Sequence, residues 1–87
     1  MLNKYFAEFL GTMLLMFIIL ATGNYFAIGS TIAILVFLFS GAFNPAVAIG
    51  LYNAGKLSKN DLLPYIIAEI LGALAGFQVF KQFVNKK

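Results

Sequence analysis

The sequence predicts an all-α membrane protein with three transmembrane helices and one re-entrant half-helix. Of its 87 residues, 62% are hydrophobic and only 10% are charged, whereas soluble domains have about 45–50% apolar and about 25% charged residues. A soluble chain of this length buries only about 60–65% of its unfolded surface, which is too little to hide so many apolar side chains. Because a membrane-spanning helix needs about 20 residues, the chain has room for about three spans with short connections.

The composition also excludes several classes of function. The chain contains no Cys and no His, so disulfides and the usual zinc sites are excluded. Its net charge of +3 comes from scattered lysines, a pattern that does not indicate nucleic-acid binding. No nucleophile–base pair and no phosphate-binding loop is visible. We therefore expect no enzymatic activity, no cofactor, no metal site and no nucleic-acid partner.

The first two predicted helices divide one long apolar stretch. Residues 5–43 contain Glu8 as their only charge, and this stretch is too long for a single span of about 20 residues. The dipeptide Gly23-Asn24 is the natural break, since both residues favour turns. The sequence predicts helix one over roughly 5–22 and helix two over roughly 26–39.

A half-helix is predicted over roughly 44–54. Asn44 is a good N-cap, and Pro45 suits the first helical position. Ala54-Gly55 then provides a C-terminal stop. At 1.5 Å per residue, about nine helical residues extend about 14 Å, or half a bilayer. The segment is too apolar for an aqueous loop and too short to span, so a re-entrant half-helix fits best.

The third spanning helix is predicted over roughly 62–80. A polar connection over 56–61 precedes it, in which Asp61 is expected to cap the helix and to place Pro64 in the first turn. Gly72 and Gly76 form a Gly-x-x-x-Gly pair, which permits close approach of another helix. Residues 81–87 form a basic tail.

The Asn44-Pro45-Ala46 segment is the strongest candidate for a functional site. A half-helix that begins at mid-membrane leaves its first N–H groups unpaired and directs about half a positive charge at the bilayer centre. That positive end repels cations and protons but not neutral molecules, and the Asn44 amide offers a donor to water. Alternatively, the tripeptide is only a turn that precedes an interfacial helix.

Three segments, in order, resemble the aquaporin (major intrinsic protein) family. Residues 8–12, Glu-Phe-Leu-Gly-Thr, are similar to the family's opening pattern. Residues 40–47, Ser-Gly-Ala-Phe-Asn-Pro-Ala-Val, resemble its first Asn-Pro-Ala loop but are one residue shorter. Residues 65–73, Tyr-Ile-Ile-Ala-Glu-Ile-Leu-Gly-Ala, resemble its third helix, which usually has Gln in place of Glu69. The resemblance implies a single aquaporin-like half unit over 1–87.

The resemblance also implies roles for the two glutamates within the apolar segments. Glu8 is expected to hold loop backbone near the half-helix, although it could instead extend to the headgroups. Glu69 is expected to hydrogen-bond loop backbone while protonated, with ion or proton binding as the alternative. Gly11, together with the Gly-x-x-x-Gly pair of helix three, is expected to serve helix packing.

The sequence departs from the family at the residues that set selectivity. Family members contain two inverted halves, each with an Asn-Pro-Ala half-helix, and the second motif is followed by an arginine. Here Val47 follows the motif, the chain has no Arg, and the filter histidine is missing. The filter aromatic of helix two falls at Tyr25 or, with a gap, at Ile28. We expect a less selective pore.

These observations predict a multi-pass integral membrane protein that forms a passive channel for water or small neutral solutes such as glycerol. The pore would form in an antiparallel homodimer, either alone or within a tetramer of such dimers, with two half-helices meeting at mid-membrane. Orientation follows the Lys/Arg difference between the two faces, and here each face has three lysines: Lys4, Lys56 and Lys59 against Lys81, Lys86 and Lys87. The alternatives are a non-transporting structural or accessory membrane protein and an ion- or proton-coupled half-transporter that uses Glu69.

Overall fold

The computed structural model describes residues 3–84, and these residues form four helices and no strand. The helices are α1 (Lys4–Thr22), α2 (Tyr25–Phe39), α3 (Pro45–Asn53) and α4 (Lys59–Phe83). The predicted all-α class is confirmed. Two helices, α1 and α4, are long and apolar enough to cross a membrane, whereas α2 has 15 residues and is shorter. Lys86 and Lys87 of the predicted basic tail lie outside the described residues.

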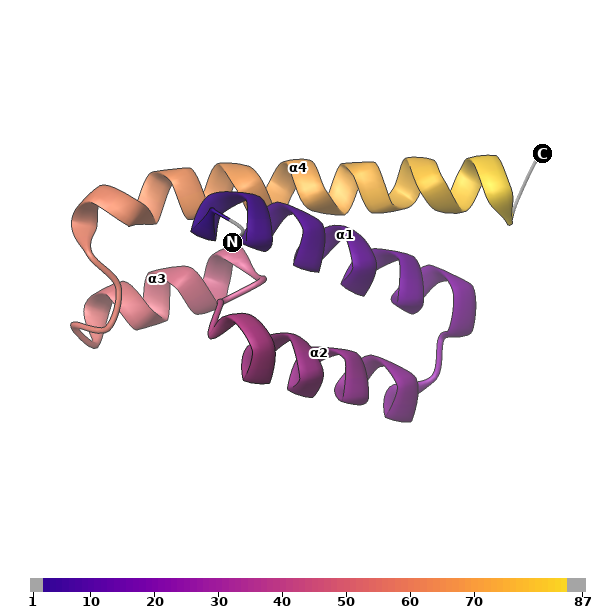
Figure 1. Ribbon diagram of the computed structural model, residues 1–87, viewed down its shortest axis with the longest axis horizontal. Helices are drawn as coiled ribbons and strands as arrows, with labels where there is room; N and C mark the ends of the chain where they lie inside the picture. Colours follow the sequence, from indigo (N-terminus) through magenta and orange to yellow (C-terminus); the bar gives the residue numbers. More distant parts are fainter. Residues whose placement is uncertain (1–2, 85–87) are drawn as a thin grey trace.

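Helices α1 and α2 form one antiparallel hairpin, and α3 and α4 form a second. The two hairpins are joined by packing of α1 against α4. In Figure 1, α1 and α2 run in opposite directions, and α3 begins partway along the molecule and runs toward the end where α4 starts. Helix α4 then extends along most of the 42 Å length. Within residues 3–84, α1 packs most extensively against α4, α2 packs against α1, and α3 packs against α4.

Two glycines of α4 let α1 and α4 approach to backbone contact. A Cβ at Gly72 would overlap the carbonyl oxygen of Phe9, and a Cβ at Gly76 would lie 2.5 Å from the carbonyl oxygen of Met13. Both glycines are buried. The helices therefore pack by close fit of small residues, which is a common way for helices to associate in lipid.

The start of α4 differs from the prediction. The helix begins at Lys59, with Ser58 as its N-cap, and the Ser58 hydroxyl accepts a hydrogen bond from the Asp61 amide at 3.2 Å. Asp61 is thus not the cap. Instead its carboxylate accepts hydrogen bonds from the Lys4 ammonium at 2.8 Å and the Tyr5 hydroxyl at 2.6 Å.

Helix α4 is also longer than predicted. Because the helix begins earlier, Pro64 lies beyond the first turn, where its missing N–H removes one intrahelical hydrogen bond. At the other end the helix continues to Phe83, past the predicted end near residue 80. The polar residues before and after the apolar segment therefore extend the helix at both ends.

Candidate functional site

Asn44 caps the N-terminus of α3, the short helix that begins partway along the molecule. Its side-chain oxygen accepts a hydrogen bond from the Ala46 amide at 2.8 Å, and Pro45 occupies the first helical position. The Asn44 amide nitrogen has no hydrogen-bond partner within residues 3–84. The cap therefore fixes the side chain by its oxygen and leaves two N–H donors for a molecule in front of the helix end.

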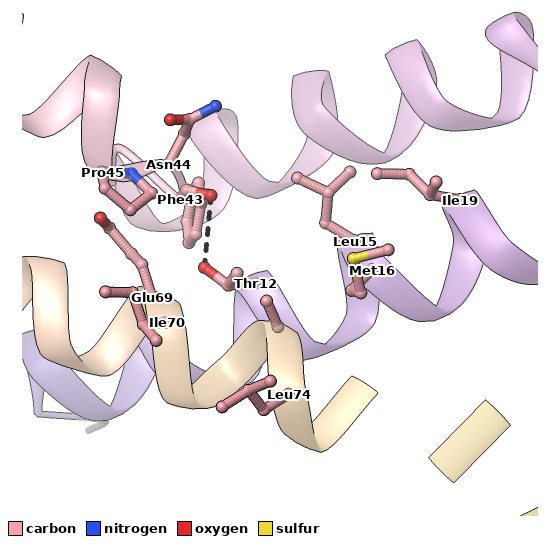
Figure 2. Close-up of a pocket in the computed structure, with 11 residues that line it drawn as sticks. Thr12, Leu15, Met16, Ile19, Phe43, Asn44, Pro45, Glu69, Ile70 and Leu74 are labelled. Atoms are coloured by element: carbon pink, nitrogen blue, oxygen red, sulfur yellow. Dashed lines mark hydrogen bonds between the residues drawn. The ribbon is translucent and has the colours of Figure 1, made fainter. Parts of the chain in front are cut away.

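The loop that leads into α3 is held by a buried carboxylate of α1. Glu8 is 1% exposed. One of its oxygens accepts a hydrogen bond from the Ala42 amide at 3.1 Å, and the other accepts from the Phe43 amide at 2.9 Å. One turn further along α1, the Thr12 hydroxyl donates to the Phe43 carbonyl at 3.4 Å (Figure 2). These contacts satisfy backbone groups that would otherwise be unpaired inside the protein.

The conformation of this loop depends on Phe43. Its φ of 57° is left-handed, a region that costs a residue other than glycine roughly 1–2 kcal/mol. The side chain is nevertheless 3% exposed, and its ring fills the space where a Cβ at Gly11 or at Gly41 would lie. The two glycines thus provide room for the ring, and ring packing together with the Glu8 hydrogen bonds offsets the backbone cost.

A pocket of about 340 Å³ lies in front of the α3 N-terminus. Figure 2 shows that α1, α4 and the loop before α3 supply its walls. Only three polar side chains line it, and the other walls are apolar. Its lining residues are Thr12, Leu15, Met16, Ile19, Phe43, Asn44, Pro45, Glu69, Ile70, Ala73 and Leu74.

Glu69 lies beside the loop backbone, at the Asn44 amide, where the sequence suggested a hydrogen bond. The side chain is fully buried, at 0% exposure, yet neither carboxyl oxygen has a hydrogen-bond partner in the described part of the chain. In Figure 2 it points from α4 toward Pro45 at the start of α3. Glu8 accepts the Ala42 and Phe43 amides, and the Asn44 amide is the loop donor that remains beside Glu69.

The structure does not bring the predicted filter residues into this pocket. Tyr25 lies at the start of α2 and is 88% exposed, and Val47 lies on α3 and is 46% exposed. Neither residue, nor Ile28, lines the pocket with Asn44. The remaining predicted residues lie as described above: Gly11 faces the Phe43 ring, and Gly72 and Gly76 face the α1 backbone.

Most of the α1 residues that line the pocket were not predicted from the sequence. Leu15, Met16 and Ile19 continue the face that carries Glu8 and Thr12. Leu15 and Met16 follow Thr12 by three and four residues and Ile19 follows it by seven, so all of them lie on one side of a helix. That periodicity was the available signal, but on a helix that is apolar all round it does not distinguish a pocket wall from a lipid-facing side.

Comparisons with known proteins agree with this geometry. The family model described as Major intrinsic protein matches residues 1–87. The chain belongs to the major intrinsic protein family. Its relatives include aquaporin Z of Brucella melitensis, which is 40% identical over 100% of this chain and 46% of the relative. They also include glycerol uptake facilitator protein-like 6 of Lactiplantibacillus plantarum, which is 35% identical over 97% of this chain and 45% of the relative.

The match to this family covers only part of each relative. Aquaporin PIP2-7 of Arabidopsis thaliana is 33% identical over 91% of this chain but only 36% of its own length. The chain thus spans about half the length, or less, of these major intrinsic protein relatives. No solved structure matches it significantly. The family is one of integral membrane channels rather than enzymes, in agreement with the apolar α1 and α4.

Proposed function

We propose that this chain forms a passive membrane channel for water or small neutral solutes such as glycerol. The observation that carries the proposal is the position of α3, whose Asn44-capped N-terminus begins partway along the molecule and opens onto a pocket. Irregular backbone at such a depth is tolerated in a membrane where it is buried in protein or lines a water-filled cavity. The names of the relatives, aquaporin Z and glycerol uptake facilitator protein-like 6, support both solute classes.

The proposed chemistry uses the α3 helix end and the Asn44 amide together. The helix N-terminus contributes about half a positive charge, and the amide nitrogen donates to a passing oxygen without gaining or losing a proton. A water or polyol hydroxyl in the pocket therefore has a donor to bind. The apolar walls offer few competing polar groups, so the solute is held weakly enough to move on.

We further propose that two copies in opposite orientations complete the pore. One chain encloses the α3 N-terminus only on the side of α1 and α4. Large apolar side chains of α2 are strongly exposed, among them Phe26 at 74% and Phe37 at 85%. These side chains need lipid or a second copy to cover them. The balance of three lysines on each face supports insertion in both orientations, and α2 would serve as the third, short span. We propose that such dimers assemble further into a tetramer of dimers.

Stopped-flow light scattering on proteoliposomes tests the channel. The wild-type protein should raise water permeability above that of empty vesicles. Asn44→Asp keeps a capping oxygen but replaces the N–H₂ donor with a negative charge, so it should lower that permeability. Asn60→Asp makes the same change at an exposed site near the start of α4 and should leave it unchanged. Permeability equal to that of empty vesicles, with no effect of Asn44→Asp, would refute the channel.

Topology mapping tests the antiparallel dimer separately. Tags at the two termini should each be accessible from both sides of the membrane. A single orientation would end the antiparallel arrangement. Crosslinks found only between parallel copies, or only to foreign proteins, would favour a structural or accessory role instead.

A further inference from the structure

Glu8 of α1 and Glu69 of α4 are the two largest fully buried side chains within residues 3–84. The Glu69 side chain points from α4 toward the start of α3 (Figure 2), and its carboxyl group lies beside the Glu8 carboxyl group and the Asn44 backbone amide. We propose that the two carboxyl groups share one proton, and that they hold the loop that positions Asn44 only while this proton is bound. The proposal deepens the proposed function, and its effect on permeability rests on that function.

The surroundings of the pair leave a proton as the group that compensates its charge. Two adjacent buried carboxyl groups cannot both be ionised unless a cation lies between them. Among residues 3–84 the only ion pair joins Lys4 to Asp61, where the Lys4 side chain is exposed. Both Glu69 oxygens are buried and sealed from the pocket, so an ion from solution does not reach them. A proton is small enough to lie between the two groups.

One shared proton also completes the hydrogen bonds of the loop. Glu8 accepts the Ala42 amide at 3.1 Å and the Phe43 amide at 2.9 Å, as an ionised carboxylate does. Such a group has about four acceptor positions, which leaves room for the hydroxyl of a protonated Glu69. The other Glu69 oxygen is then free to accept the Asn44 amide beside it. The acid pair thus holds three successive backbone amides, and its own O–H···O⁻ contact is a strong hydrogen bond.

Loss of the proton should weaken this arrangement. Glu69 would then present a second negative charge to Glu8, with no donor between their oxygens. Opening of the loop exposes the pair, and exposed carboxyl groups are ionised above about pH 5. The closed loop therefore binds one proton more than the open loop, so a rise in pH favours opening. A neutral Glu69 also adds no negative charge beside the positive end of α3, whose repulsion of cations the proposed channel uses.

Few other side chains respond to pH in the same range. The chain has no His and no Cys, while ordinary carboxyl groups ionise below about pH 6 and tyrosine and lysine at or above about pH 10. The loop over residues 40–44 has no titratable side chain. The other charged or titratable groups on the four helices are Lys4 and Tyr5 of α1, Tyr25 of α2, Tyr52 of α3, and Lys59, Asp61, Tyr65 and Lys81 of α4.

The shared proton can be observed on the full chain in lipid nanodiscs. The sequence contains only two glutamates, so ¹³C at the glutamate carboxyl carbon reports on this pair alone. Both carboxyl signals of the wild-type protein should move together as one proton is lost between about pH 6 and about pH 10. In Glu69→Gln the amide donates to Glu8 in place of the proton, so the Glu8 signal should stay at its ionised position throughout. Two wild-type signals at the ionised position over the whole range, or an equal shift in Glu69→Gln, would overturn the proposal.

The pH profile of water permeability in proteoliposomes gives a second readout. Wild-type permeability should fall severalfold as the carboxyl signals titrate, whereas Glu69→Gln should give a flat profile because its amide has no proton to lose in this range. Asp61→Asn changes the one acidic residue outside the pair and should keep the wild-type profile. A wild-type profile that stays flat while the carboxyl signals titrate, or a Glu69→Gln profile that falls like the wild type, would refute control of the loop by the pair. Absence of permeability at every pH would refute the channel instead, and the carboxyl titration would still decide whether the proton is shared.

Discussion

Replacing Glu8 with Gln should loosen the loop before α3 without unfolding the helices. Each Glu8 oxygen accepts one loop amide, from Ala42 at 3.1 Å and from Phe43 at 2.9 Å. Glutamine retains one accepting oxygen and presents an N–H₂ group to the other amide, so one of the two hydrogen bonds is lost. A hydrogen bond to a charged group is worth about 1.5–3 kcal/mol. Since each 1.4 kcal/mol is a factor of ten, the loop should open roughly 10- to 140-fold more often.

A single cysteine can report this opening. The chain has no Cys, and Ala42 is only 9% exposed, so Ala42→Cys places one protected thiol in the loop. When opening and closing are fast, the labelling rate of such a thiol follows the population of the locally open state. In detergent micelles or nanodiscs, Glu8→Gln should therefore raise the labelling rate by the factor given above.

Glu69→Gln is the matched control. It makes the same chemical change at the other buried glutamate, which accepts neither the Ala42 nor the Phe43 amide. The labelling rate of Ala42→Cys should stay within about twofold of its original value. Equal acceleration by Glu8→Gln and Glu69→Gln, or no acceleration by Glu8→Gln, would refute the assignment of Glu8 as the residue that holds the loop.

Three further results are expected. Gly76→Ala should lower the free energy of unfolding by about 1–3 kcal/mol, because its Cβ would lie 2.5 Å from the Met13 carbonyl oxygen; Gly29→Ala, where nothing lies within 4 Å, should instead stabilise the protein by about 0.5–1 kcal/mol in the same denaturant titration. Phe43→Ala should destabilise by about 3–5 kcal/mol, since it empties the space between Gly11 and Gly41, and an unchanged unfolding midpoint would contradict the packing described. Asp61→Asn should leave the unfolding midpoint nearly unchanged at high salt, because the Lys4 partner is 56% exposed.

The sequence predicted helix boundaries well at positions where the residue type favours only one structural role. Gly23 has the left-handed φ of 55° expected of a break, and Asn44 and Pro45 lie at the start of α3 as their propensities indicate. The start of α4 was harder, because Ser58 and Asp61 are both good N-caps. In the structure Asp61 binds Lys4 and Tyr5, and Ser58 caps the helix instead. Lys4 and Tyr5 are distant from Asp61 in the sequence, so this contact could not be predicted from local signals.

The site was predicted only in part, for a related reason. The sequence identified Glu8 and Glu69 as unusual, since charges inside apolar helices are costly and tend to be functional. The sequence did not show which of the two glutamates accepts hydrogen bonds from the loop amides. In the structure Glu8 accepts both amides and Glu69 accepts none. The left-handed φ at Phe43 was also unpredictable, because such a conformation in an aromatic residue follows from packing around it rather than from its own preference.

The contact between α3 and α4 bears on how the protein is made. A ribosome completes α1, α2 and α3 before α4 exists, yet α1 packs most extensively against α4, and α3 packs against α4. The nine residues of α3 are too few to remain across a bilayer on their own. The short helix α3 must therefore remain at the membrane surface and insert only after α4 has been synthesised. Assembly order thus departs from synthesis order, and the segment that would line the channel is the last to reach its place.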